Sequence, residues 1–450
     1  MHTRKRYMNQ KTLKIIFISY LLVVFVGALI LMLPFAHIGK LSFIDALFTS
    51  SSATCVTGLI VKSTSEDFTL FGQSIILLLI QIGGVGYMSI VTLFFLFMKK
   101  NLNIHEKTMA KDSLNYSSNS DIQDFLKKVF LFIFLIEALG AAILTVRFWM
   151  DMPFSKALWQ GMFHAISAFN NAGFSLFTDS LVGYNSDFTT IGTIGLLIVI
   201  GGIGYLVLVE LYFKASRKKF MFSAHTKITL WGTLILLFSG MVLFLAIEWD
   251  NKGVFASLSV YQKLLNSFFL SVNFRTSGFN SLDLSQLSDA SLFCSTLYMM
   301  SGGGAGSTAG GIKITTVAVL IIATLHTMKL SNQAPHAFKR TITPEIINRA
   351  SAIIIVASFI TILATLLLVE TQHTPFMKTL FEVVSAFCTV GVSVGNGNIL
   401  SFSENFNSFG KSIIILLMLI GRMGIFAFGF LLIGKEKTKH IQYPEGRILL

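Results

Sequence analysis

The sequence is poor in charged residues and in proline. Asp, Glu, Lys and Arg make up only 13% of its 450 residues, and there are 6 prolines. Soluble domains carry about a quarter charged residues. A chain this poor in charge has no room for a separate soluble domain of ordinary composition.

Cysteine and catalytic motifs are scarce as well. The three cysteines, Cys55, Cys294 and Cys388, are too few for a disulfide framework, and none stands in a CxxC or Cys/His metal pattern. The segment "HEKTM" at His105 lacks the second histidine of HExxH, and the predicted spans contain no pair of Asp. We therefore expect no enzyme, which leaves a transporter or a non-transporting membrane sensor.

Long apolar runs are abundant. Hydrophobic residues are 53% of the chain, and the mean hydropathy is +0.72. A hydrocarbon core of about 30 Å takes roughly twenty helical residues to cross. Runs of this length predict a polytopic membrane protein in a lipid bilayer. They lie near 13–34, 72–98, 128–149, 190–213, 229–248, 290–326, 350–369 and 411–433.

The positive charges indicate how the chain is oriented. Most Lys and Arg residues fall in the N-terminal tail, in 99–128, 214–228 and 327–349, and after residue 433. Under the positive-inside rule these segments are cytoplasmic, which places both termini on that side of the membrane. We expect this membrane to be the plasma membrane, a bacterial inner membrane. The net charge of +13 then follows from membrane topology, and no nucleic-acid binding is expected.

Four segments between successive runs repeat one pattern. They read "FTSSSATCVTG", "FHAISAFNNAG", "FFLSVNFRTSG" and "FEVVSAFCTVG", ending at Gly58, Gly173, Gly278 and Gly391. Each has phenylalanine ten residues before the glycine and serine six or seven before it. About 24 to 30 residues later comes a second glycine cluster: "GGVGY", "GGIGY", "GGGAG" or "GRMGI". Four matches in register indicate an internal repeat rather than chance.

Each unit is predicted to consist of a span, a short re-entrant helix, a glycine turn and a second span. Non-helical backbone at membrane depth is tolerated only where protein buries it or it lines a water-filled path. The predicted fold is an all-α polytopic membrane protein with four pseudo-symmetric span–pore-helix–span repeats around a central pore, as in a potassium channel. The repeats are assigned to 1–98, 99–213, 214–326 and 327–433, followed by a cytoplasmic tail at 434–450.

The four glycine turns are the predicted ion-binding site. A selective cation filter presents backbone carbonyls to the ion, and glycine adopts the left-handed conformations this needs at no steric cost. The negative dipole end of each short helix would face the pore. Ligands without carboxylates suit a monovalent ion. The predicted filter residues are Val56, Thr57, Gly58, Asn171, Ala172, Gly173, Thr276, Ser277, Gly278, Thr389, Val390 and Gly391.

The third unit contains a glycine-rich run that we interpret as a gate. Residues 291–326 would measure about 54 Å as one helix, too long for the hydrocarbon core, so a helix broken at bilayer depth is predicted. We expect this break in the third unit alone. A P-loop is excluded because Ile312 stands where lysine belongs, and close helix packing is the alternative. The loop consists of Gly302, Gly303, Gly304, Ala305, Gly306, Ser307, Thr308, Ala309, Gly310 and Gly311.

Charged residues near these segments also receive predicted roles. Arg422 lies inside the last span, and we hypothesise that it holds the loop closed through its carbonyls. Lys313 either takes part in gating or snorkels toward the cytoplasm. Arg275 is expected to point away from the ion and to bind carbonyls or a carboxylate, with direct control of the ion as the alternative. Glu382 is expected to stabilise a helix N-terminus or to pair with Arg275.

These features resemble the Trk/Ktr/HKT superfamily of potassium transporters. The resemblance covers nearly the whole chain, and is carried by the glycine tetrad, "NFRTSGF", the broken third unit and Arg422. Sodium-preferring plant relatives are similar but have serine at the first glycine, so Gly58 favours potassium. The first span begins near residue 13, without the additional N-terminal helices of Trk-type members, which resembles the Ktr membrane subunit. The resemblance implies a homodimer that sits on a cytoplasmic ring of RCK-type regulatory subunits. Those subunits, rather than this chain, would bind a nucleotide.

The predicted function is therefore potassium uptake, gated by the intramembrane loop and by the cytoplasmic ring. The alternative is a sodium-selective or sodium–potassium cotransporting relative of the HKT type. The sequence leaves open whether a sodium ion is coupled to uptake or only activates it.

Overall fold

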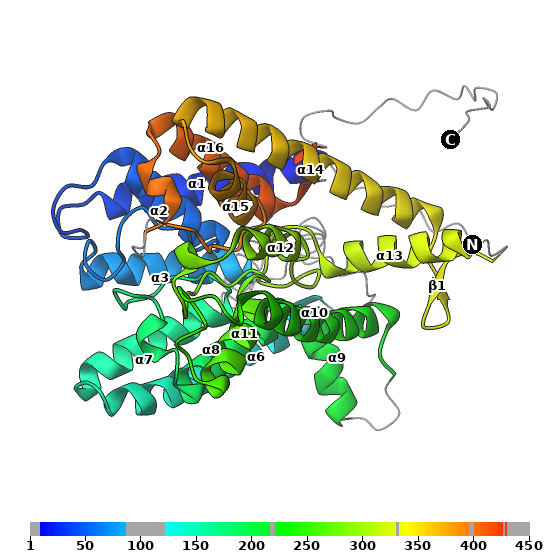
Figure 1. Ribbon diagram of the computed structural model, residues 1–450, viewed down its shortest axis with the longest axis horizontal. Helices are drawn as coiled ribbons and strands as arrows, with labels where there is room; N and C mark the ends of the chain where they lie inside the picture. The colour runs from blue at the N-terminus through cyan, green and yellow to red at the C-terminus, as the bar shows by residue number, and fades with distance from the viewer. Residues whose placement is uncertain are drawn as a thin grey trace.

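Helices make up most of the described structure (Figure 1). The computed structural model describes residues 10–86, 122–216, 221–329, 333–395, 400–425 and 428–429. The predicted tail at 434–450 and the ends of the predicted spans 72–98 and 411–433 lie outside these residues. Within them the helices form four successive units that follow the same order.

Each unit opens with a long helix whose large apolar side chains face outward. On α10, Trp231 and Phe238 are 58% and 70% exposed, and Ile355 on α14 is 68% exposed. Apolar side chains exposed in this way indicate a lipid-facing surface. Residues 127–149 of α6, together with α10 and α14, are long and apolar enough to cross a membrane. The opening helices are α1 (Gln10–Leu31), α6 (Ile122–Trp149), α10 (Ala224–Glu248) and α14 (Pro344–Gln372).

A short helix follows in each unit and ends just before the glycine turn. The longest has 16 residues, which is about 24 Å and too short to cross. Two of them begin at a capping serine, since Ser42 and Ser259 accept hydrogen bonds from the backbone N–H groups of Asp45 and Gln262. The short helices are α2 (Phe43–Cys55), α7 (Phe154–Phe169), α11 (Val260–Asn273) and α15 (Phe376–Phe387).

The second helix is also interrupted in the second unit, and in the fourth at Gly424, so the expectation of a break in the third unit alone is wrong. α8 and α9 meet at an angle of 99°, at Gly204 with φ of 102°. Gly86 and Gly424, where α3 and α16 end, each have φ of 88°. Positive φ cannot continue a right-handed helix. These helices are α3 (Leu70–Val85), α8 (Phe188–Gly202) with α9 (Tyr205–Ser216), α12 (Asp289–Met300) with α13 (Ile314–Met328), and α16 (Ser408–Met423).

The four units contact one another in a closed ring. The second helix of each unit packs against the short helix of the next: α3 on α7, α8 on α11, α12 on α15, and α16 back on α2. Figure 1 accordingly shows the orange fourth unit beside the blue first unit. The glycine turns that follow the short helices meet at the middle of this ring.

The remaining elements are small. A two-stranded antiparallel hairpin, β1 (His336–Ala337) and β2 (Arg340–Thr341), precedes α14 and departs from the all-α expectation. Three short 3-10 helices lie in the connections after the glycine turns: η1 (Val182–Tyr184), η2 (Leu284–Gln286) and η3 (Phe402–Asn405).

Candidate ion-binding turns and the loop beside them

The four predicted filter glycines, called the filter glycines below, share a backbone conformation that glycine adopts without steric cost. Their φ angles lie between 71° and 99°. The residue two positions earlier is left-handed too, although it is never glycine and is β-branched in three units. Such residues rarely adopt positive φ, and the associated strain, about 1–3 kcal/mol each, gathers at functional sites. These residues are Val56 (56°), Asn171 (58°), Thr276 (81°) and Thr389 (50°).

A serine six residues before the glycine holds the turn against its short helix. Ser52 Oγ accepts a hydrogen bond from Gly58 N at 3.1 Å, and Ser385 Oγ accepts one from Gly391 N at 3.1 Å. In the second unit Ser167 Oγ donates to the carbonyl just after the glycine at 2.8 Å. The third unit has no serine at this position, and the neighbouring asparagine bonds the turn instead.

The close approach of the turns to one another also requires glycine. A Cβ atom on Gly58 would lie 2.6 Å from Ala172 O in the next unit. One on Gly173 would lie 2.5 Å from Gly278 Cα. Contacts this short do not occur with real side chains. Both the positive φ and the close packing between units therefore require glycine at these positions, as the sequence pattern predicts.

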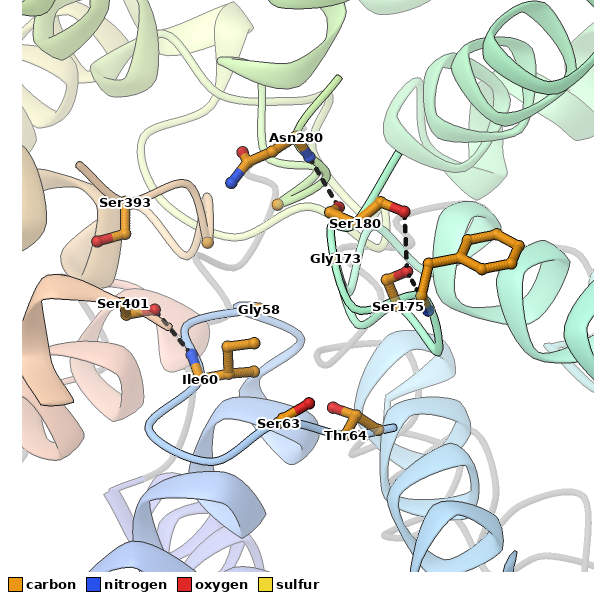
Figure 2. A pocket seen from close by; sticks show the side chains of 13 residues that line it. Gly58, Ile60, Ser63, Thr64, Gly173, Ser175, Ser180, Asn280, Ser393 and Ser401 are labelled. Carbon is orange, nitrogen blue, oxygen red and sulfur yellow. Dashed lines mark hydrogen bonds between the residues drawn. The ribbon is translucent and has the colours of Figure 1, made fainter. Parts of the chain in front are cut away.

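The turns surround a small pocket of about 20 Å³, which we call the mouth pocket. That is space for about one water-sized particle. All four filter glycines line it, and the eight other predicted filter residues are buried beside them with 1% or less exposed. Figure 2 shows polar side chains from all four units around it. Its polar lining residues are Ser63, Thr64, Ser175, Ser180, Asn280, Ser393 and Ser401.

The second glycine cluster lets the second helix touch the end of the short helix of the same unit in three of the four units. In three units, a Cβ on the first cluster glycine would overlap the backbone oxygen four residues before the filter glycine. The sequence pattern identifies these clusters, but it suggests close helix packing only for the third, as the alternative to a gate. The distances from the added Cβ would be 1.9 Å for Gly83 to Thr54 O, 1.8 Å for Gly201 to Phe169 O, and 1.8 Å for Gly421 to Phe387 O.

The predicted gate loop, 302–311, binds the helix ends of other units. Gly304 N donates to Gly202 O at 2.7 Å at the end of α8. Gly311 N donates to Gly421 O at 3.3 Å near the end of α16. The last carbonyls of a helix have no intrahelical partner. The breaks in the neighbouring second helices thus supply acceptors for the loop.

The same loop touches two of the filter turns. Thr308 Oγ1 donates to Asn171 Oδ1 at 3.0 Å. Gly310 lies so close to Thr389 that an added Cβ would be 2.0 Å from its Oγ1. The structure therefore brings predicted gate residues into direct contact with predicted filter residues of the second and fourth units.

Both basic residues assigned to the gate bind its carbonyls. Arg422 donates to the carbonyl oxygens of Thr308 in the loop and of Gly83 and Gly84 at the end of α3, the last at 3.3 Å. Lys313 Nζ donates to two loop carbonyl oxygens at 2.6 and 3.2 Å. Its ammonium group therefore turns back to the loop and does not snorkel away.

The expectations for Arg275 and Glu382 need correction. Arg275 is 5% exposed, and its Nη2 donates to Thr233 Oγ1 on α10 at 3.2 Å, so a hydroxyl replaces the expected carbonyl or carboxylate. Glu382 lies in the interior of α15 rather than at its start. It accepts hydrogen bonds from Ser403 N at 3.0 Å and from Ser393 Oγ at 2.5 Å, and Arg275 is not among its partners.

Sequence reasoning missed a matched pair of buried titratable residues. His164 Nε2 lies 2.9 Å from Ser175 Oγ, just as Glu382 binds Ser393. His164 and Glu382 both stand nine residues before a filter glycine, and both serines stand two residues after it and line the mouth pocket. Comparison of the four segments position by position would have revealed the correspondence.

The chain matches a known family over almost its whole length. Residues 2–437 match the TrkH family, described as cation transport protein. The chain belongs to this family. It is 38% identical over 435 residues to Ktr system potassium uptake protein B of Bacillus subtilis (strain 168), with 97% of this chain and 96% of the relative covered.

Further relatives of this TrkH-family chain span similar lengths. Ktr system potassium uptake protein B of Vibrio alginolyticus is 37% identical over 439 residues, with 97% and 94% covered. Potassium/sodium uptake protein NtpJ of Enterococcus hirae is 36% identical over 442 residues, with 96% and 95% covered. The resemblance predicted from the sequence, to the Ktr branch of the superfamily, is confirmed.

A solved structure shares the fold. The crystal structure of the potassium transporter TrkH from Vibrio parahaemolyticus matches with a TM-score of 0.73 and 17% sequence identity, over 96% of this chain and 87% of that one. This likeness shows a mainly helical fold, and the family match together with the apolar helices makes the chain a multi-pass membrane protein.

Proposed function

We propose that this TrkH-family protein takes up potassium across the plasma membrane through its four glycine turns. The observation that carries the proposal is the left-handed backbone at each filter glycine and again two residues earlier, in all four units. Strain of this kind persists only where the surrounding structure enforces it. A filter built from backbone carbonyls is a physical reason to enforce it.

The chemistry of the mouth pocket supports a monovalent cation as the substrate. None of the described residues that line it is charged, whereas hydroxyl and amide oxygens are plentiful. Calcium and magnesium sites generally include carboxylates. Two relatives are named potassium uptake proteins, in agreement with potassium as the transported ion.

The proposal includes a gate and partners. The loop 302–311 closes the path in one state, held there by Arg422 and Lys313, and moves aside in another. We place both termini in the cytoplasm and the mouth pocket on the outer side. A homodimer on a cytoplasmic ring of nucleotide-binding RCK-type subunits would bias the loop. The resemblance to Ktr membrane subunits is the support for these partners.

Sodium is the second candidate ion. NtpJ, a relative of similar identity, is named a potassium/sodium uptake protein. A sodium-selective or sodium–potassium cotransporting protein would keep the same four turns, with a different fit to the ion. The ratio of sodium to rubidium uptake separates the two functions.

The test is uptake of labelled rubidium in cells that lack their own potassium transporters. Gly58→Ser should raise the sodium-to-rubidium ratio about fivefold, equivalent to about 1 kcal/mol, because the new Cβ lies 2.6 Å from Ala172 O and displaces the turn. Gly39→Ser is the matched control, since Gly39 also has positive φ but no atom within 4 Å of an added Cβ.

Each result has a consequence for the proposal. Absence of rubidium uptake by the wild-type chain, present in the membrane at normal level, overturns potassium transport. An unchanged ion ratio in Gly58→Ser, with uptake retained, overturns the assignment of Gly58 to the filter.

A further inference from the structure

The break between α8 and α9 is a docking site for the gate loop. The two helices meet at 99°, and Gly204 at the corner lies so close to the loop that an added Cβ would be 2.8 Å from Ala305 O. Gly202 O and Gly201 O at the end of α8 accept hydrogen bonds from loop N–H groups at 2.7 and 3.3 Å. The loop therefore occupies the place where the next turn of a continuous α8 would have bonded.

Tyr205, the first residue of α9, contacts both the loop and a third unit. Its backbone N donates to Gly306 O at 2.9 Å, a bond that an uninterrupted helix would have made internally. Its hydroxyl donates to Gly84 O at the end of α3 at 3.0 Å. The side chain is 3% exposed. One residue thus joins the loop of the third unit to the first unit from its place in the second.

The acceptor of Tyr205 is shared with Arg422. Gly84 O receives the Tyr205 hydroxyl at 3.0 Å and Arg422 Nη2 at 3.3 Å. Arg422 also donates to Thr308 O, two residues along the loop from the partner of Tyr205 N. Two side chains from different units therefore connect neighbouring points of the loop to the same carbonyl of α3.

We propose that Tyr205 is a positioning residue that forms a second lock on the gate loop, beside Arg422, through the shared Gly84 carbonyl. This inference rests on the proposed gating function of residues 302–311. The loop leaves its closed position only if Gly306 separates from Tyr205 N or if the first turn of α9 moves with it. The Tyr205 hydroxyl opposes the second route because it fixes that turn to α3.

The test is resting rubidium flux through the purified full-length protein in liposomes. Tyr205→Phe keeps the buried ring and the backbone N–H but removes the hydroxyl. We expect resting flux to rise about fivefold, the effect of losing one buried hydrogen bond from the closed state. A residue with a merely structural role would lower the flux on substitution. Tyr212→Phe is the matched control, because Tyr212 lies on the same helix with 45% of its surface exposed, and it should leave flux unchanged.

A second measurement does not depend on transport. Hydrogen exchange of peptides covering 301–313 should be faster in Tyr205→Phe than in the wild-type chain and in Tyr212→Phe. Unchanged or lower flux together with unchanged exchange overturns the lock. Faster exchange with unchanged flux overturns it as well, because the loop would then loosen without opening the path.

The double variant tests the shared acceptor. In each single variant the other side chain still binds Gly84 O and partly replaces the lost lock. The double variant, Tyr205→Phe with Arg422→Ala, loses both, so its flux should exceed the product of the two single effects. If the flux of the double variant rises only by the product of the two single effects, the proposed coupling through the shared Gly84 carbonyl is wrong. If Arg422→Ala also leaves flux unchanged in protein that does transport rubidium, the gating function of the loop fails and the lock fails with it. A rise with Arg422→Ala alone keeps the gate and rejects only Tyr205.

Discussion

The ring of glycine turns and the ring of second-helix glycine clusters differ in symmetry. At the turns, all four units have positive φ at the same two positions and approach each other closely. At the clusters, three units place a glycine against the end of their own short helix. The third unit has a loop between α12 and α13 there instead.

Under the proposed function, this difference lets one repeat serve two purposes, ion binding and gating. A ring of carbonyls around an ion requires similar geometry from every unit, because all of them contact the same small sphere. A single moving part requires one unit to depart from the others. The ends of α8 and α16 then provide free carbonyls that bind the irregular loop directly, whereas those at the end of α3 bind the side chains of Arg422 and Tyr205.

The largest expected effect comes from breaking the ring of turns. Gly391→Ala would place a Cβ 1.9 Å from Thr57 O at φ of 87°. Overpacking costs about 1–3 kcal/mol and left-handed backbone about 1–2 kcal/mol. Rubidium uptake should fall roughly a hundredfold. Gly39→Ala has similar φ but open space, and should transport normally; equal losses in the two variants would show that φ, rather than ring closure, is limiting.

Removing Arg422, which binds the loop from the fourth unit, should raise ion flux rather than lower it. Arg422→Ala should raise resting flux about tenfold, since a hydrogen bond from a charged group contributes about 1.5–3 kcal/mol. Arg349→Ala removes an equal charge from a surface pair with Glu345 on α14 and serves as control. Slower transport by folded, membrane-inserted Arg422→Ala would reject the closing role of Arg422.

The smallest effect is expected at the regular clusters. Gly201→Ala would put a Cβ 1.8 Å from Phe169 O, so α8 must move away from the end of α7. The melting temperature in detergent should drop by about 5 °C. At Gly192, also on α8, the nearest atom to an added Cβ is 3.7 Å away, and Gly192→Ala should melt like the wild-type chain. Similar melting of both variants would show that the close approach at Gly201 is dispensable.

Several features could be predicted because they repeat or because a length does not fit. The four glycine turns were found by alignment of four segments in register, and the helix break at 302–311 by the mismatch between 36 residues of apolar sequence and the membrane core. The hypothesis for Arg422 followed from the cost of a charge inside a span. Its contact with the loop carbonyl of Thr308 agrees with that hypothesis.

Other features could not be predicted, because they depend on contacts between distant segments. The 99° break at Gly204 lies in the glycine cluster of 190–213, which the sequence predicts to be one continuous span. The bend makes sense once the loop is seen docked at the break. The positive φ of Val56 and Thr276 contradicts the local preference of β-branched residues. Glu382 could not be paired with Ser393 and Ser403 from spacing alone.

The sequence by itself determined the family, the membrane-spanning class and the four glycine positions, because hydropathy and repeats are local patterns that survive without coordinates. Tertiary structure alone decided which carbonyls are left free at the helix ends and which groups take them. A free carbonyl in a membrane protein must find a donor, and that donor here comes from another unit, hundreds of residues away in the chain, as Arg422 does for Gly83.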